Sequence, residues 1–221
     1  MNRNKNALLL FTKVPVPGRI KTRLTIARGG ILTEEEAASF YMSTLLDVAE
    51  IGFQALAILN DNESSDEAAS PRYDFIISCT PPEEQKSLEN IFEENGPWPQ
   101  PIQFINDRGQ NFDQHFDDAF QQLFERGYHA VVSIGGDLPT MPVTHIVQAF
   151  QWLSYFDQLA DRGGFVQAPC QSCGVSLVGY TRETAMDSEG VFYNPEGVPC
   201  LDAYTKKASE RDVPTALLSS V

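Results

Sequence analysis

A loop rich in cations follows the first apolar segment of the chain. Residues 12–24 read Thr-Lys-Val-Pro-Val-Pro-Gly-Arg-Ile-Lys-Thr-Arg-Leu, so Arg19, Lys21 and Arg23 place three cations within five residues. Arg can hold a phosphate through two parallel hydrogen bonds, whereas Lys acts as a mobile point charge. Gly18 allows backbone amides to approach a ligand closely. The spacing is neither a Walker loop nor a G-x-G-x-x-G turn. It predicts a site for a chain of phosphates, with a solvated surface loop as the alternative.

A single carboxylate stands out in the second half of the chain. Asp137 follows the apolar segment 130–134 and two glycines, Gly135 and Gly136, and it precedes Leu138-Pro139. A carboxylate at the end of a buried strand is a typical ligand for Mg²⁺, which would offset the charge of bound phosphates. The alternative is that Asp137 caps a turn or the next helix.

Other reactive side chains give weaker patterns. Cys170 and Cys173 form a C-x-x-C pair, which is typical of a redox pair or half a zinc site. The sequence offers no second close pair, so we interpret both as ordinary thiols, with a redox accessory protein as a minor hypothesis. His115 is a candidate to face the site, and Asp107 is a second-line candidate near an acceptor, from its loop position alone.

The segments that must position these residues alternate between strand and helix patterns. Strands are expected at 7–12, 53–59, 73–79, 102–105, 130–134, 165–168 and 175–178, and helices at 33–50, 82–94, 111–126, 142–156 and 199–211. Thr33 and Glu36 form a capping box, and the Phe112/116/120/124 stripe is interpreted as core. This order predicts a three-layer α/β/α sandwich with a mostly parallel sheet, in a single domain spanning residues 1–221. Ligands of such sheets bind beyond the carboxyl ends of the strands.

Composition narrows the class of protein. The 221 residues are 42% hydrophobic and carry 16 Lys and Arg against 30 Asp and Glu, a net charge of −14. The first 28 residues nevertheless hold seven cations and no carboxylate, which suits an anionic ligand. Global disorder, a nucleic-acid partner, a membrane span and a signal peptide are not expected. We expect a cytoplasmic enzyme; the sequence is compatible with a homodimer but does not fix the oligomeric state.

With both loops identified, the chain resembles a known family. K-x-P-x-P-G-x-x-K-T-R-L over residues 13–24 and G-x-D-x-P over residues 135–139 are similar to the uncharacterised bacterial nucleotide-diphospho-sugar transferase family. That family is related to 2-phospho-L-lactate guanylyltransferase and has the glycosyltransferase type A fold. The resemblance covers about residues 7–180 and excludes the tail from Arg182. It implies that Asp137 binds Mg²⁺ or Mn²⁺ and that the loops bind nucleotide phosphates, through Lys13, Pro17, Gly18, Arg19, Lys21, Thr22, Arg23, Gly135 and Gly136.

Two positions depart from the family pattern. The family has an acidic D-G-G stretch before the strand at 175–178, where this chain has Ser172-Cys173-Gly174. The family's helix pattern L-G-x-R-M corresponds to Phe112–Phe116, which puts His115 in the place of an arginine. A second carboxylate of the family pattern is therefore absent at Ser172.

The sequence leads to two hypotheses from different classes. The first is a metal-dependent transferase that passes a group from a nucleoside triphosphate or nucleotide sugar to a small acceptor, with Lys21, Arg23 and Asp137 as catalytic residues. Within it, guanylyltransferase-like nucleotidyl transfer releases pyrophosphate, whereas glycosyl transfer releases a nucleoside diphosphate. The second is a nucleotide-binding protein without turnover, which the absent carboxylate favours.

Overall fold

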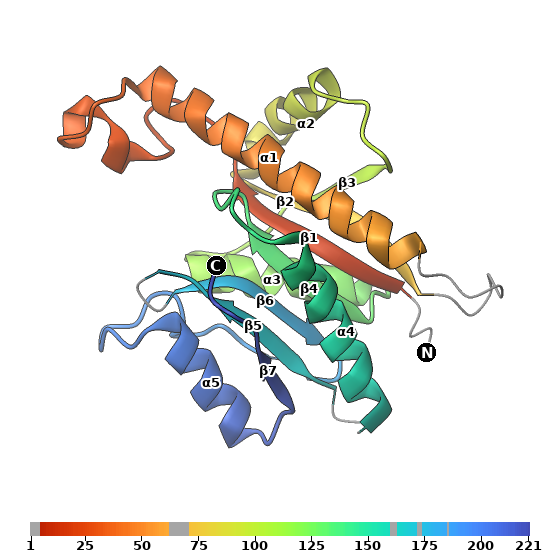
Figure 1. Ribbon diagram of the computed structural model, residues 1–221. Helices are drawn as coiled ribbons and strands as arrows, with labels where there is room; N and C mark the ends of the chain where they lie inside the picture. Colours follow the sequence, from red (N-terminus) through yellow and green to blue (C-terminus); the bar gives the residue numbers. More distant parts are fainter. Residues whose placement is uncertain (1–4, 62–70, 160–162, 172–173, 185) are drawn as a thin grey trace.

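The computed structural model describes residues 5–61, 71–159, 163–171, 174–184 and 186–221, built around one seven-stranded sheet (Figure 1). Along the sheet the strands lie in the order β3-β2-β1-β4-β6-β5-β7. Their bounds are β1 Lys5–Lys13, β2 Arg72–Thr80, β3 Ile102–Ile105, β4 Ala130–Gly135, β5 Phe165–Pro169, β6 Val175–Thr181 and β7 Thr215–Leu217. β6 pairs antiparallel with β4 and β5, and the remaining pairs are parallel. The predicted mostly parallel sheet is thereby confirmed.

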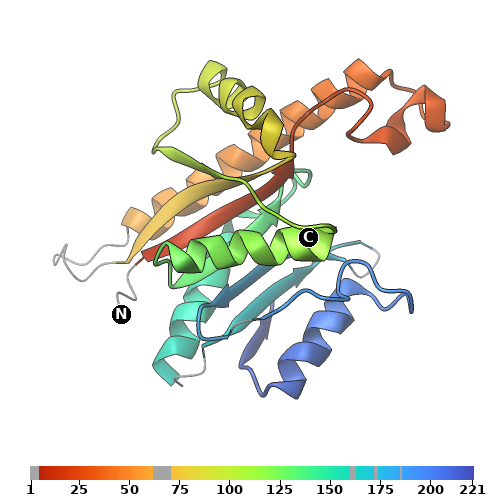
Figure 2. The same ribbon diagram turned by 180° about the vertical axis from the view of Figure 1, so that it is seen from behind.

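Helices cover both faces of this sheet, as predicted. Helices α1, α2 and α4 pack on one face, and α3 and α5 pack on the other (Figures 1 and 2). Their bounds are α1 Glu34–Asp61, α2 Gln85–Glu94, α3 Phe112–Glu125, α4 Val143–Leu159 and α5 Cys200–Glu210. Leu8 and Leu10 of β1 belong to one core cluster and Ala7 and Leu9 to the other, because successive side chains of a strand point to opposite faces.

Helix α1 corrects one prediction. The expected helix end near Glu50 and the expected strand at 53–59 are both wrong, because the helix continues to Asp61. The segment after Gly52 is apolar on nearly all sides, and such a short run does not distinguish a buried strand from a buried helix. An 18-residue stretch of α1 is apolar enough to cross a membrane. Half of that stretch is buried inside the protein, as in a core helix of this length. The capping box at its start is confirmed by reciprocal bonds between Thr33 and Glu36.

Gly52 is fixed by close packing of α1 on the sheet, and its replacement is our first prediction. A Cβ at this position would lie 2.6 Å from the Phe75 ring and 3.1 Å from Leu8. Alanine improves helix propensity by about 1 kcal/mol, but overpacking a core costs about 1–3 kcal/mol. We therefore expect Gly52→Ala to lower the free energy of unfolding in urea, whereas Ser43→Ala on the exposed face of α1 leaves it within about 0.5 kcal/mol. A stabilised Gly52→Ala variant would contradict this packing.

Two smaller features differ from the sequence reading. Strand β7 was not predicted, since three residues give no periodic pattern. In α3, Phe116, Phe120 and Phe124 are buried as expected, but Phe112 is only partly buried and faces the cavity described next.

Candidate functional site

A cavity of about 700 Å³ opens where β1, β2 and β4 end. Its wall also includes the first residues of β6, which lie at the same edge because that strand runs in the opposite direction. The start of α3, Tyr41 of α1, the loops after β1 and β4, and the pair Phe192 and Tyr193 also line the cavity. The cavity therefore lies at the edge of the sheet where ligands of open α/β folds bind.

The loop after β1 brings one of its predicted cations directly to the predicted metal ligand. Lys21 Nζ lies 2.8 Å from Asp137 Oδ2, and both residues line the cavity. The backbone of Lys21 is left-handed, with φ 48° and ψ 31°, a conformation that costs a non-glycine residue about 1 kcal/mol or more. This turn directs the Lys21 side chain across the cavity mouth, so the two sequence motifs meet in space.

A hydrogen-bonded chain fixes the end of β1 beside them. The Lys13 amide donates to the Tyr41 hydroxyl at 3.5 Å, that hydroxyl lies 2.6 Å from Thr12 Oγ1, and Thr12 donates to the Lys13 carbonyl at 3.1 Å. Burial raises the pKa of the Tyr41 hydroxyl, which keeps it protonated and able to donate to Thr12. A Cβ on Gly136 would lie 2.8 Å from Thr12 Oγ1 and 2.7 Å from Leu45 Cδ1, so this position accepts only glycine without rearrangement.

The described cavity wall offers a single carboxylate as a metal ligand. Asp137 is the one carboxylate among the described residues that line the cavity, and its side chain is 54% exposed. Mg²⁺ binds to one or two carboxylates and completes its shell with water and substrate phosphates. A half-exposed carboxylate at the mouth of a cavity that also presents ammonium groups fits that mode of binding.

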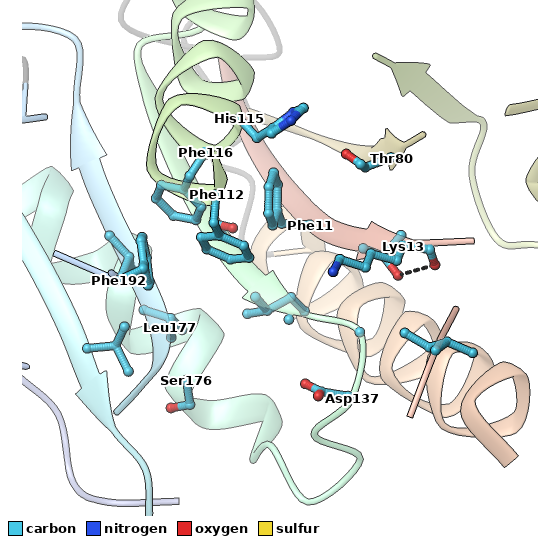
Figure 3. A pocket seen from close by; sticks show the side chains of 18 of the residues that line it. Phe11, Lys13, Thr80, Phe112, His115, Phe116, Asp137, Ser176, Leu177 and Phe192 are labelled. Carbon is cyan, nitrogen blue, oxygen red and sulfur yellow. Dashed lines mark hydrogen bonds between the residues drawn. The ribbon is translucent and has the colours of Figure 1, made fainter. Parts of the chain in front are cut away.

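An aromatic wall faces this charged side. Phe11 makes edge contacts with Phe112 and Phe116 at centroid distances of 5.3 Å, and Phe192 lies 4.7 Å from Phe112. Figure 3 shows these rings gathered beside α3, with Lys13 and Asp137 on the other side of the cavity. The cavity thus combines a charged mouth with an apolar interior.

A buried carboxylate holds the histidine of this wall. Asp107 has no exposed surface, and its Oδ1 lies 2.5 Å from His115 Nδ1. Ser78 donates to Asp107 Oδ2 at 2.5 Å, and Thr80 donates to Oδ1. Asp107 therefore does not line the cavity itself but acts on it through His115, which does.

The structure separates the predicted site residues into two groups. Lys13, Lys21, Gly135, Gly136 and Asp137 line the cavity. The others are outside its wall, on the loop that projects from the molecule: Pro17, Gly18, Arg19, Thr22 and Arg23. Sequence reasoning missed Thr12, Tyr41 and the aromatic wall, whose members come from segments without a shared motif.

The structure describes Cys170 of the C-x-x-C pair but not its partner, and it does not describe the position where the family pattern has an acidic residue. Ser172 and Cys173 lie outside the described residues. Burial raises the pKa of the Cys170 thiol, and the nearby Asp137 adds to this effect, which disfavours the thiolate that redox exchange requires.

A second group of side chains that could bind a metal ion lies at the other end of the strands, next to the start of β4. Within the described segments, His129, Asp157 and Glu183 bring one ligand atom each to within 4.8 Å of one another. Both ring nitrogens of His129 face a carboxylate, Nε2 towards Asp157 and Nδ1 towards Glu183 at 3.5 Å. This arrangement joins the start of β4 to α4 and the end of β6.

The fold is similar to that of several transferases of known structure. It superposes on a provisionally assigned nucleotide-diphospho-sugar transferase from Desulfovibrio desulfuricans G20 with a TM-score of 0.71 and 21% identity, covering 97% of this chain and 80% of the other. A cytidylyltransferase from Leptospira borgpetersenii serovar Hardjo-bovis gives 0.51 and 11%, covering 96% and 76%. A CMP:2-keto-3-deoxy-manno-octonic acid synthetase complexed with CTP gives 0.52 and 10%, covering 97% and 90%. The architecture is thus that of nucleotide-diphospho-sugar transferases.

The chain belongs to the bacterial family described as "Uncharacterized protein conserved in bacteria (DUF2064)", whose profile matches residues 66–194. The matched segment contains Asp137, Asp107 and His115, whereas the cationic loop precedes it. No curated protein sequence matches the chain.

Proposed function

We propose that this protein is a metal-dependent transferase that acts on a nucleoside triphosphate or a nucleotide sugar and passes a group to a small acceptor. The observation that carries the proposal is the 2.8 Å contact between Lys21 and Asp137 at the cavity mouth. It puts a phosphate-binding cation and a metal-binding carboxylate side by side at the ligand-binding edge of the sheet. A synthetase of the same fold that is complexed with CTP supports the same choice of ligand.

The residues of the site divide the work between binding and charge stabilisation. Lys13 and Lys21 present ammonium groups to phosphate oxygens, and Arg23 and Arg19 add charge from the projecting loop. Pro17, Gly18 and Thr22 shape that loop. Gly135 and Gly136 line the cavity after β4, and Gly136 lets this turn pack closely on Thr12 and Leu45. Asp137 would hold Mg²⁺ or Mn²⁺. When bound, the metal ion would offset the negative charge of the phosphates and polarise the reacting phosphorus. Lys21 stabilises the negative charge that grows on the leaving phosphate.

Titration with nucleotides tests this function. With Mg²⁺ present, we expect calorimetric binding of at least one nucleoside triphosphate or nucleotide sugar, and turnover when an acceptor is added. Release of pyrophosphate identifies nucleotidyl transfer, and release of a nucleoside diphosphate identifies glycosyl transfer. Absence of binding across a panel of the common nucleotides would contradict the proposal.

One observation favours a second candidate, a nucleotide-binding protein without turnover. Asp137 stands alone as a carboxylate in the described cavity wall. Tight nucleotide binding with release of neither product, across many acceptors, would support this alternative.

A further inference from the structure

We propose that His115 is the general base that takes the proton of an acceptor hydroxyl, so that the acceptor is a neutral hydroxyl compound with an apolar body and not a phosphate ester. This inference rests on the proposed transferase function and adds the class of acceptor to it. The inference is carried by His115 in the cavity wall, by the buried Asp107 carboxylate bonded to it, and by the aromatic side chains of the same wall.

The hydrogen bonds of Asp107 determine which nitrogen of His115 carries the proton. A carboxylate is only an acceptor, and Asp107 receives hydroxyl donors from Ser78 and Thr80. His115 Nδ1, at 2.5 Å, must then be a third donor, which leaves Nε2 of the neutral ring with a free lone pair. Among the described residues, no hydrogen bond reaches Nε2, and the side chain is 23% exposed in the cavity wall.

The position of Asp107 makes this arrangement durable. A buried carboxylate that loses its hydrogen-bond donors costs roughly 1–3 kcal/mol or more. Asp107 has no exposed surface, so it stays where Ser78 and Thr80 of β2 donate to it. The ring of His115 is in turn held by Asp107, which lies 2.5 Å from its Nδ1. A histidine oriented by a third group in this way is the arrangement that general-base catalysis requires.

The cavity wall identifies the acceptor. A phosphate or carboxylate acceptor is already ionised near neutral pH and needs no base, whereas a hydroxyl group does. The cavity wall that contains His115 also contains Phe11, Phe112 and Phe192, which favour an apolar body. The Lys21 ammonium lies with Asp137, where it serves the donor's phosphates.

The chemical step balances without another reagent. The acceptor O–H bond breaks and its proton moves to His115 Nε2. The oxygen forms a bond to the reacting phosphorus or sugar carbon of the donor. The bond from that atom to the leaving phosphate oxygen breaks, and its electron pair leaves with pyrophosphate or with the nucleoside diphosphate. Asp107 stabilises the imidazolium that results, so it is a positioning residue.

The first test uses the free protein and needs no substrate. In a ¹⁵N-histidine NMR spectrum recorded at mildly alkaline pH, we expect neutral His115 to carry its proton on Nδ1, and Asp107→Asn to change this distribution. A proton on Nε2 in the wild type would overturn the proposal. The spectrum is assigned with His115→Gln, because the sequence has only three histidines.

The second test measures donor consumption with two matched probes, 2-phenylethanol and 2-phenylethyl phosphate. We expect consumption with the alcohol, with His115→Gln lowering kcat by about 10²–10⁴-fold at an unchanged nucleotide Kd and removing the acidic limb of the pH profile. The other titratable groups around this cavity are Asp107, Lys13, Lys21, Tyr41, Asp137 and Tyr193, and all of them stay in that variant. His145→Gln, which changes a histidine outside the cavity wall, is the control and keeps kcat and the profile.

Three results would overturn the role of His115. They are faster consumption with the phosphate ester, a weaker nucleotide Kd with unchanged kcat in His115→Gln, or bound nucleotide that is consumed with neither probe. In each of them nucleotide binding persists and the nucleotide site stands. Loss of nucleotide binding in the wild type would instead remove the proposed function, while the NMR result would still report on the His115 geometry.

Discussion

Replacing Lys21 by alanine is expected to lower kcat/KM for nucleotide transfer by about 10²–10³-fold, the usual effect of removing one group that stabilises developing charge. The reason is geometric, because Lys21 is the loop cation that lines the cavity and lies 2.8 Å from Asp137. Its ammonium can reach phosphate oxygens that share the mouth with that carboxylate. Nucleotide binding by calorimetry and steady-state rates of product release measure the two parts of the effect.

Two further alanine variants sharpen this prediction. Arg23→Ala, on the exposed part of the same loop, is expected to have a smaller effect that diminishes with salt, since exposed charges are screened. Arg28→Ala serves as the control, because Arg28 is a cation of the same basic segment outside the cavity wall. Nucleotide binding that is unchanged in both Lys21→Ala and Arg23→Ala would remove the loop from the site.

The second large effect is expected for Asp137→Asn. This change keeps the size of the side chain but removes the charge that a hard cation requires. Since metal stabilisation of a phosphoryl transition state is worth several kcal/mol, transfer is expected to fall by roughly 10³-fold or more. Manganese electron paramagnetic resonance in the presence of nucleotide provides an independent readout, in which the variant should lose the bound signal.

The matched control for this variant is Asp47→Asn, an exposed carboxylate in the middle of α1 that lies outside the cavity wall. It should bind manganese and nucleotide as the wild type does. Because Lys21 and Asp137 are in contact, the double variant is expected to show a non-additive effect in a thermodynamic cycle. A variant at Asp137 that retains manganese binding and full transfer would show that another residue holds the metal.

Much of the fold follows from local patterns in the sequence. The strand at 102–105 and the helix begun by the capping box at Thr33 were placed correctly, because a short apolar run and a capping box are both local features of the sequence. The segment 53–59 was misassigned as a strand because a short apolar run does not distinguish a buried strand from a buried helix. In the structure Gly52 lets this part of α1 pack against the Phe75 ring. That contact joins residues far apart in the chain, and no local pattern reports it.

The site was predictable to the extent that strand ends define it. Asp137 was identified from its position after a strand, and Asp107 from its loop position alone. Their roles differ because Asp107 is buried and bonded to His115. The sequence treats Arg19, Lys21 and Arg23 as equivalent cations. The left-handed backbone at Lys21 distinguishes them, since side-chain directions in an irregular loop depend on individual dihedral angles and not on a period.

The ion pair between Lys21 and Asp137 also bears on the order in which ligands arrive. A divalent cation that arrives without nucleotide must displace the Lys21 ammonium from the Asp137 carboxylate. The ammonium is then left without an anionic neighbour. A cation already chelated by a nucleotide brings phosphate oxygens that offer the ammonium a new partner. The side chains are 25% and 54% exposed, so the pair is worth about 0–1 kcal/mol, or about fivefold in affinity at most. The unliganded protein therefore disfavours free metal slightly and favours the complex that carries the substrate.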